Sequence, residues 1–256
     1  MPPGPPDAPI DWRLPGWYKA RPSPCLEAAK RHPNYKIKLG PNEGRGIAAG
    51  FWFNAGMQSS AEVHINENGT VTVIEGNPDI GGSRASMALM AAEELGVPYD
   101  RVRVLVADTE SAGYTNVTGG SRVTFATGMA VIQAARDIIA QCKQRAAATW
   151  GIEEAMVDWQ DGQVVPKPGV NADLKPLTLA QIAGNAGRTG GPLLGRASLN
   201  ARGPGPGFSI NMADVRVDPE TGKVKIEQFV AVDDFGNIIN PMIVEGQVQG
   251  GIAQGL

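Results

Sequence analysis

The feature that most constrains the fold is an internal repeat, in which a β-hairpin leads through a loop into a helix. Residues 61–73 (Ala-Glu-Val-His-Ile-Asn-Glu-Asn-Gly-Thr-Val-Thr-Val) match residues 213–226, which have one extra residue in the turn. Alternating valines predict two strands in each copy, and a glycine marks the turn between them. Each hairpin is followed by an acidic loop and an apolar helix, which begins at Ser83 in the first copy and at Pro241 in the second. Coincidence between two Val-alternating hairpins is the alternative, but we interpret the pattern as a true repeat. It predicts an α+β fold with repeated β-hairpin–loop–helix units and sheets covered by helices.

The rest of the chain also shows a mixture of strand and helix patterns. Residues 1–24 contain Pro-Pro-Gly-Pro-Pro and little periodicity, which predicts a tail or a linker. The predicted helix that begins at Ser83 ends at Gly96, a typical C-terminal stop. The other predicted elements are helices at 25–34, 123–149 and 179–183, strands at 51–53 and 101–107, and a hairpin around Asp161-Gly162.

Two loops of nearly the same composition precede long apolar helices. They are Gly81-Gly82-Ser83-Arg84 and Gly119-Gly120-Ser121-Arg122. Glycine lets a ligand approach the backbone, and the first amides of a helix lack internal partners, so such loops can bind anions. Two of them indicate a ligand with more than one phosphate, or one phosphate held from both sides. The structural alternative is a tight turn with an N-cap serine. The candidate ligand-binding residues are Ile80, Gly81, Gly82, Ser83, Gly119, Gly120, Ser121 and Arg122.

Composition excludes several other classes of function. The net charge of -3 and the absence of a Lys/Arg cluster argue against nucleic-acid binding. We find no apolar run long enough to span a bilayer and no signal-peptide pattern, so we expect a cytoplasmic protein without a membrane span. Cys25 and Cys142 are predicted to be free thiols in a reducing compartment. With two histidines and no Cys-x-x-Cys, the chain is not expected to ligate a metal directly.

The last predicted helix, residues 240–256, is unusual because it contains four glycines. Each interior glycine costs up to about 1 kcal/mol relative to alanine, so close approach of another backbone or a flat ligand is expected in return. The sequence stops at Leu256 in the middle of the helical pattern, which we interpret as truncation.

Four segments together resemble the molybdopterin-binding large subunit of the xanthine dehydrogenase/aldehyde oxidase family. They are residues 91–98 (Ala-Ala-Glu-Glu-Leu-Gly-Val-Pro), 105–109 (Leu-Val-Ala-Asp-Thr), 118–122 (Thr-Gly-Gly-Ser-Arg) and 240–256. The resemblance begins at about Gly44 and covers most of the chain. It divides the sequence into an N-terminal extension or linker to a missing upstream part, residues 1–43, and a molybdopterin-binding domain truncated at its C-terminus, residues 44–256.

The resemblance implies part of a molybdenum hydroxylase, an oxidoreductase that adds water-derived oxygen to an aromatic N-heterocycle or an aldehyde. Its molybdenum is held by the dithiolene of a pterin, expected here as molybdopterin cytosine dinucleotide, without a direct protein ligand. An iron–sulfur subunit and an FAD subunit would carry the electrons away. The protein then supplies binding and shape while the cofactor supplies the chemistry. A non-enzymatic cofactor-carrying or assembly subunit on the same scaffold is the alternative.

Two departures from the family pattern bear on the site. The family has Gly-Gln-Gly in the first loop, where the glutamine hydrogen-bonds near the molybdenum centre, and Gly82 stands at that position here. The second loop fits the family's pterin- or phosphate-binding loop better, and Asp108-Thr109 is expected to fix it. The family's catalytic glutamate belongs to a Gly-x-Gly-Glu motif that would lie beyond Leu256. No catalytic residue is therefore assigned, and the fragment alone is expected to be inactive.

Overall fold

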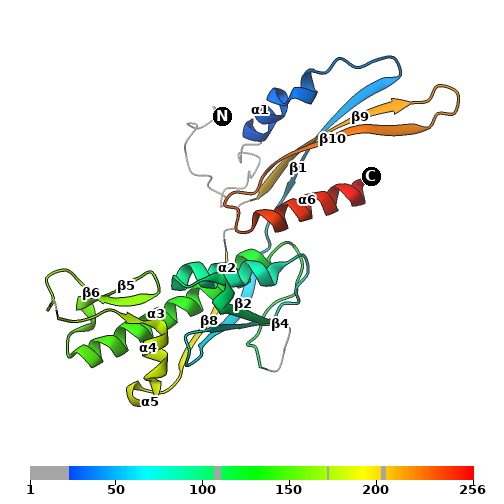
Figure 1. The fold of residues 1–256 in the computed structure, drawn as a ribbon. Helices are drawn as coiled ribbons and strands as arrows, with labels where there is room; N and C mark the ends of the chain where they lie inside the picture. Colours follow the sequence, from blue (N-terminus) through cyan, green and yellow to red (C-terminus); the bar gives the residue numbers. More distant parts are fainter. Residues whose placement is uncertain (1–22, 107–110, 172, 203–205) are drawn as a thin grey trace, which may run out of the picture. The chain divides into compact units, whose positions relative to one another are not determined.

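The computed structural model describes residues 23–106, 111–171, 173–202 and 206–256, which form two compact units. Unit 1 comprises Met1–Asn54, Gly203–Ile238 and Val248–Leu256, and unit 2 comprises Ala55–Arg202 and Ile239–Gln247 (Figure 1). The predicted tail before residue 23 and the predicted role of Asp108-Thr109 lie outside the described residues. The domain boundary between residues 43 and 44 stays a prediction.

Unit 2 contains a four-stranded sheet in the order β4-β3-β2-β8. Its strands are β2 (Met57–Ile65), β3 (Val71–Glu75), β4 (Val102–Val106) and β8 (Leu193–Ala201). The predicted hairpin between β2 and β3 is confirmed, with Val63 paired to Val73 and Gly69 in the left-handed region at φ 79°. β3 and β4 run parallel, whereas β2 is antiparallel to both of its neighbours. The connection from β3 to β4 is therefore a crossover through a helix.

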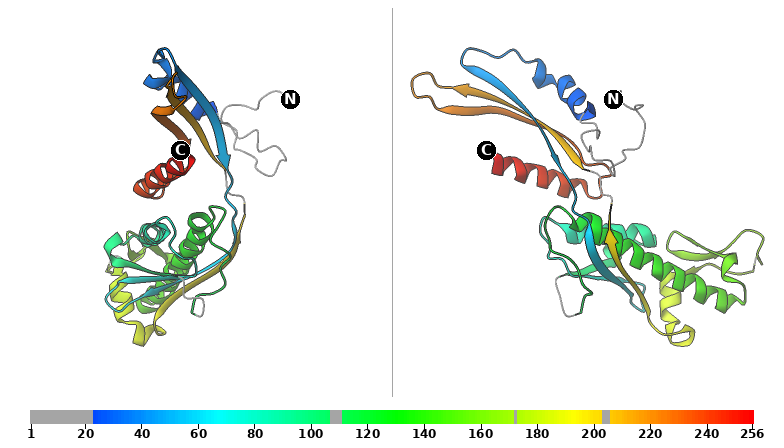
Figure 2. Two further views of the ribbon diagram at one scale, coloured as in Figure 1. Left: turned by 90° about the vertical axis from the view of Figure 1, so that its right-hand side faces the viewer. Right: turned by 180° about the vertical axis from the view of Figure 1, so that it is seen from behind.

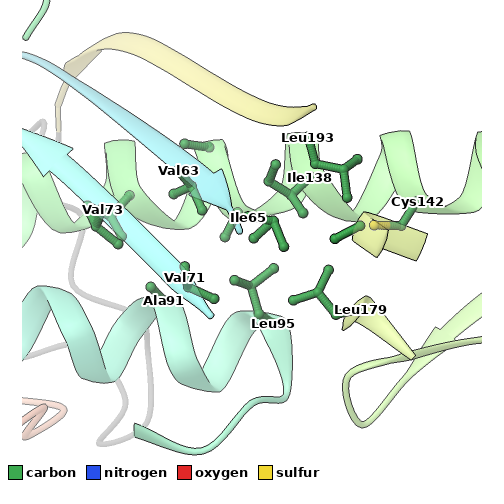
Figure 3. Close-up of a cluster of buried hydrophobic side chains, with 14 of the residues drawn as sticks. Val63, Ile65, Val71, Val73, Ala91, Leu95, Ile138, Cys142, Leu179 and Leu193 are labelled. Atoms are coloured by element: carbon green, nitrogen blue, oxygen red, sulfur yellow. The ribbon is translucent and has the colours of Figure 1, made fainter. Parts of the chain in front are cut away.

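Helices α2 (Ser83–Leu95) and α3 (Gly128–Trp150) pack on unit 2's sheet (Figure 2). α2 has the predicted bounds, and Gly96 ends it in the left-handed conformation at φ 63°. α3 begins later than predicted because a π-helical turn, η4 (Val123–Thr127), precedes it. Alternate strand residues meet apolar residues of both helices and of residues 179–183 in one buried cluster (Figure 3). The side chains labelled there are Val63, Ile65, Val71, Val73, Ala91, Leu95, Ile138, Cys142, Leu179 and Leu193.

A short 3₁₀ helix, η3 (Tyr99–Arg101), precedes β4, and the remaining elements of unit 2 outside its main sheet follow α3. They are η5 (Glu154–Met156), the small sheet of β5 (Val157–Gln160), β6 (Gln163–Pro166) and β7 (Leu177–Thr178), and helices α4 (Leu179–Gly184) and α5 (Ala186–Thr189). The predicted hairpin at Asp161-Gly162 joins β5 to β6. Thr178 and Gln181 form a capping box that starts α4, which satisfies orphan amides at the helix end.

The continuous helical stretch Val123–Trp150 is long and apolar enough to span a membrane by length and composition alone. The expectation that no such run exists is therefore wrong. Within unit 2 this stretch acts as a core helix, because Ala130, Ala134 and Ile138 are fully buried against the sheet. Cys142 is buried there too, and burial raises the pKa of its thiol to about 12. Both cysteines are free, as predicted.

Unit 1 contains a three-stranded antiparallel sheet in the order β1-β9-β10. Its elements are α1 (Ser23–Arg31), η2 (Pro33–Lys36), β1 (Glu43–Trp52), β9 (Gly207–Val217) and β10 (Val224–Asp234). β9 and β10 are the second hairpin of the repeat, and β1 pairs with the other edge of β9. Cys25 and Ala29 of α1 pack on Ile210 and Met212. The sequence predicted neither the length of β1 nor this pairing.

Helix α6 (Pro241–Gly255) confirms the last predicted helix. The space that a Cβ would occupy is open at each of its four glycines, Gly246, Gly250, Gly251 and Gly255. The close approach that we expected to compensate these glycines is therefore not provided by the described residues of this chain.

Candidate functional site

The two glycine-bearing loops meet at one edge of unit 2's sheet. The first loop, residues 76–82, follows β3, and the second loop, described here for residues 111–122, follows β4. Because β3 and β4 are parallel neighbours, their carboxyl ends lie at the same edge, where open α/β sheets bind ligands. Asn77 of the first loop donates from Nδ2 to the carbonyl of Asn116 at 3.2 Å and to Oγ1 of Thr118 at 2.8 Å. The structure thus brings the two predicted loops together.

In the first loop, a carboxylate already occupies the helix N-terminus. Gly82 is the N-cap of α2 and Ser83 is its first helical residue, so the predicted N-cap serine is wrong. Asp79 takes over the capping: its Oδ1 accepts from the amide of Arg84 at 3.3 Å and from the hydroxyl of Ser83 at 3.2 Å. A negative side chain is stabilised there by the helix dipole and competes with any phosphate at the same amides.

Side chains of α6 lie against both glycines of the first loop. A Cβ added at Gly81 would lie 2.7 Å from Nε2 of Gln247, and one at Gly82 would lie 2.7 Å from Cδ1 of Ile243. Both glycines adopt the left-handed backbone conformation, with φ of 83° for Gly81 and 87° for Gly82. The sequence missed Gln247 as a neighbour of the loop. The only signal was the glycine-rich pattern of residues 240–256, which suggested contact with a backbone or a flat ligand.

The two glycines of the second loop have different environments. Gly120 has φ 69°, and its carbonyl accepts from the amide of Ala55 at 3.0 Å. A Cβ added to Gly120 would lie 2.9 Å from the Cβ of Ala55. The loop itself therefore requires glycine at 120. Gly119 is exposed and the space beside it is open. Ser121 is also exposed and has φ 56°, an unusual conformation for a residue with a side chain. Gly119 is the position where a ligand can approach the backbone.

Arg122 is fully buried and its guanidinium is used within the protein. Nε donates to the carbonyl of Gly56 at 2.7 Å, and Nη2 donates to the carbonyl of Gln58 at 2.6 Å and to Oγ of Ser59. Nη1 donates to the carbonyl of Asn116 at 3.0 Å. Burial lowers the pKa of Arg122 below its ordinary value. Arg122 thus joins the second loop to β2, a role that the sequence did not reveal, whereas cofactor binding by the eight candidate residues stays a prediction.

Apolar side chains are exposed on both loops. Ile80 on the first loop is 71% exposed, and Tyr114 and Val117 on the second loop are 72% and 66% exposed. Exposed apolar side chains beside accessible backbone are typical of a surface that another molecule covers. Among the described residues, no group of three or more His, Cys, Asp and Glu side chains could hold a metal ion.

Glu75 is a buried carboxyl group at the end of β3, directly before the first loop. Its Oε2 accepts from the amide of Asn77 at 2.6 Å, while Oε1 has no hydrogen-bond partner among the described residues. Burial raises the pKa of Glu75 to about 7, and the hydrogen bond from Asn77 opposes this. A residue with this pKa changes its charge in the neutral range.

Comparison with known proteins identifies the family. A family model described as a molybdopterin cofactor-binding domain matches residues 26–256. The chain belongs to that family. It is 35% identical over 207 residues to the carbon monoxide dehydrogenase large chain of Hydrogenophaga pseudoflava, covering 78% of this chain and 25% of the relative. It is 29% identical to the aldehyde oxidoreductase molybdenum-binding subunit of Escherichia coli K12, covering 83% of this chain and 28% of the relative.

Solved structures of the family have the same fold. A Cu,Mo-CO dehydrogenase superposes with a TM-score of 0.73 at 29% identity, covering 88% of this chain and 31% of that chain. Quinoline 2-oxidoreductase from Pseudomonas putida 86 gives 0.72 at 28% identity, covering 83% of this chain and 29% of that chain. The resemblance to molybdenum-binding large subunits and the α+β fold are confirmed. The chain spans about a quarter of the length of the curated relatives that it matches.

The described residues fit a molybdopterin better than a protein-ligated metal. The pterin carries its own sulfur ligands, so the protein has to provide hydrogen bonds and shape. Open backbone at Gly119, the amide of Gln247 and the apolar side chains of Ile80 and Val117 are groups of this kind. Family membership makes molybdenum–molybdopterin the expected cofactor.

Proposed function

We propose that the edge formed by the first and second loops binds the molybdopterin of a molybdenum hydroxylase. The observation that supports this most strongly is the pairing of the loops through Asn77, which leaves Gly119 open and Ile80 and Val117 exposed. Gly81, Gly82, Gly119, Gly120 and Ser121 would offer backbone groups, with Ser83 at the helix start. The cofactor is proposed to be the cytosine dinucleotide form, as the resemblance implied.

The charges at the two loops favour different parts of such a cofactor. The carboxylate of Asp79 occupies the start of α2, so the first loop is suited to the neutral, hydrogen-bonding edge of a pterin. The described part of the second loop, residues 111–122, has no acidic side chain that would repel a phosphate, and Asp108 and Glu110 precede it in the sequence. When bound, the cofactor supplies the oxygen- and electron-transfer chemistry. The residues of this chain bind it, orient it and exclude water.

The whole protein is proposed to hydroxylate an aromatic N-heterocycle or an aldehyde with oxygen from water. Iron–sulfur and FAD subunits are the proposed partners, and the cytoplasm is the proposed location. An assembled complex incubated with heavy-oxygen water and an aldehyde or N-heterocycle should incorporate the label into the product. A complex that carries molybdenum and pterin but converts neither substrate class would favour the carrier or assembly function instead. Gly82 favours that second candidate, because it has no side chain with which to reach the molybdenum centre. Ile243 occupies the space that such a side chain would need.

Gly119→Val tests whether the second loop binds the cofactor. Its side chain would enter open space, so the thermal stability of the apo-protein should hardly change. Gly187→Val is the matched control, because that glycine of α5 also borders open space and lies far along the chain from both loops. We expect Gly119→Val to reduce the molybdenum and pterin content of the assembled enzyme several-fold, and Gly187→Val to leave it unchanged. Equal cofactor content in the two variants would contradict the proposed site.

A further inference from the structure

A chain of buried polar side chains runs beneath the two loops. The backbone amide of Asn77 donates to Oε2 of Glu75, and the side-chain Oδ1 of Asn77 accepts from the hydroxyl of Thr127 at 2.6 Å. Thr127 and Ser59 share a hydrogen bond between their hydroxyls at 3.0 Å, and Ser59 accepts from Arg122. All five side chains are at most 1% exposed. Buried polar groups are costly unless they are hydrogen-bonded, so a continuous network of this kind fixes its members tightly.

Asn77 is the member that joins the most elements. Its side-chain carbonyl bonds to Thr127, next to the start of α3, and its side-chain amide bonds to Asn116 and Thr118 of the second loop. Its own backbone belongs to the first loop. The side-chain oxygen of Asn77 therefore bonds to Thr127, while its side-chain NH2 group bonds to the second loop.

The backbone beside Asn77 also lies close to the second loop. A Cβ added at Gly76 would lie 3.4 Å from Cβ of Thr115, so a side chain at position 76 would be in van der Waals contact with the second loop. Thr115 in turn accepts from the amide of Ser60 on β2 at 3.2 Å, which holds it to the sheet. Movement of the first loop relative to the second would break contacts on both sides of Asn77.

We propose that Asn77 is a positioning residue that locks the first loop to the second, so that the two bind a cofactor as one unit. The part of this inference that concerns cofactor binding rests on the proposed function. The coupling between the two loops does not depend on it. Ordering of either loop by a ligand should then order the other, because both share the hydrogen bonds of one buried side chain.

Asn77→Asp keeps one set of these hydrogen bonds and removes the other. The carboxylate still accepts from Thr127 but cannot donate to Asn116 or Thr118. Asn77→Ala removes all the hydrogen bonds of this side chain. Leu179→Ala is the matched control, because Leu179 is a buried core residue on α4 and has no part in the network, so it lowers stability without touching the loops.

Hydrogen exchange measured by mass spectrometry reads the loops directly, whether the chain is studied alone or in its assembly. Both Asn77 variants should accelerate exchange several-fold in peptides covering residues 78–84 and 112–122. The control should not do so selectively. Exchange in the loops no faster than in Leu179→Ala would overturn the proposal.

Cofactor binding gives a readout that a purely structural role would not change. In the wild-type assembly, the loaded form should show slower exchange in both loops than the cofactor-free form. In Asn77→Asp this protection should be weaker in both loops than in the control, and the molybdenum and pterin content should fall below that of the control. Protection and cofactor content equal to those of the control would refute the coupling. A wild-type assembly without any cofactor would refute the proposed function, while the exchange of the cofactor-free variants would still decide whether Asn77 links the loops.

Discussion

Ile243 of α6 lies directly over Gly82, where a Cβ would be 2.7 Å from its Cδ1 atom. Gly82→Gln, which introduces the glutamine that the resemblance implies at this position, should therefore lower stability. The left-handed φ of 87° disfavours any side chain, and the overlap adds to this, so we expect a loss of about 1–3 kcal/mol. Ile243→Ala in the same chain should recover part of the loss, which thermal unfolding of the single and double variants would reveal. Additive losses would show that the two residues do not compete for this space.

Gly120→Val should destabilise the cofactor-free protein more than Gly119→Val does. Gly120 has φ 69° and touches Ala55, whereas the space beside Gly119 is open. A β-branched residue at a left-handed position is strained by about 1–3 kcal/mol. Comparison of the two melting temperatures measures the difference. Equal melting temperatures would mean that the second loop adapts to a side chain at 120.

Arg122→Ala should be among the most damaging single substitutions in unit 2. It would remove the buried guanidinium that donates to the carbonyls of Gly56 and Gln58 and to the hydroxyl of Ser59, and it would leave a cavity. A hydrogen bond from a charged group contributes about 1.5–3 kcal/mol and a buried cavity adds to the loss, so we expect a total loss of about 3 kcal/mol or more by denaturant unfolding. Arg84→Ala is the control, because its side chain is more than half exposed. A loss as small as that of the control would contradict the role assigned to Arg122.

Glu75 should make stability fall as pH rises from acid to neutral. Burial raises its pKa from 4.5 to about 7; the hydrogen bond from the backbone amide of Asn77 opposes the rise most, Asp79 adds to it, and Arg84 and Arg122 oppose it. Below pH 4.5 the folded and unfolded chains are both protonated at this residue, so its stabilising contribution is fully present there. Above that pH the unfolded chain ionises first, and about 3 kcal/mol is lost by the time the pH reaches the folded pKa.

Glu75→Gln provides the measurement for this pH dependence. The glutamine retains an acceptor for the amide of Asn77 and has no charge to bury. Unfolding free energies of the variant should change less with pH than those of the wild type between pH 4.5 and about 7. Identical pH profiles would show that Glu75 does not titrate in this range.

Local patterns in the sequence predicted much of unit 2. The bounds of α2 were correct because its run of apolar and alanine residues and its stop at Gly96 are properties of a short segment. The hairpin between β2 and β3 was predicted for the same reason. β1 was recognised only at its end, because its Gly- and Ala-rich sequence does not alternate and its structure depends on pairing with β9.

The two loops of the candidate site were recognised from sequence, but the contacts between them were not. Two similar glycine loops were visible as motifs. The contact of Gln247 with Gly81 and the burial of Arg122 arise from residues far apart in the chain. The motifs therefore indicated the two loops, whereas long-range packing decides which of their glycines borders open space and which is required by the fold.

The pairing of β1 with β9 has a consequence for how the chain acquires its structure. Glu43 and Arg216, which are bonded across these strands, are separated by 173 positions in the sequence, and all of unit 2's sheet lies between them. Closing so long a loop is entropically unfavourable until the intervening chain is compact. Unit 2, whose strand β3 reaches its parallel partner through one helix, would thus condense first and hold the ends of the distant strands within reach. During synthesis, β1 is made long before β9, so it would stay unpaired until β9 has been made.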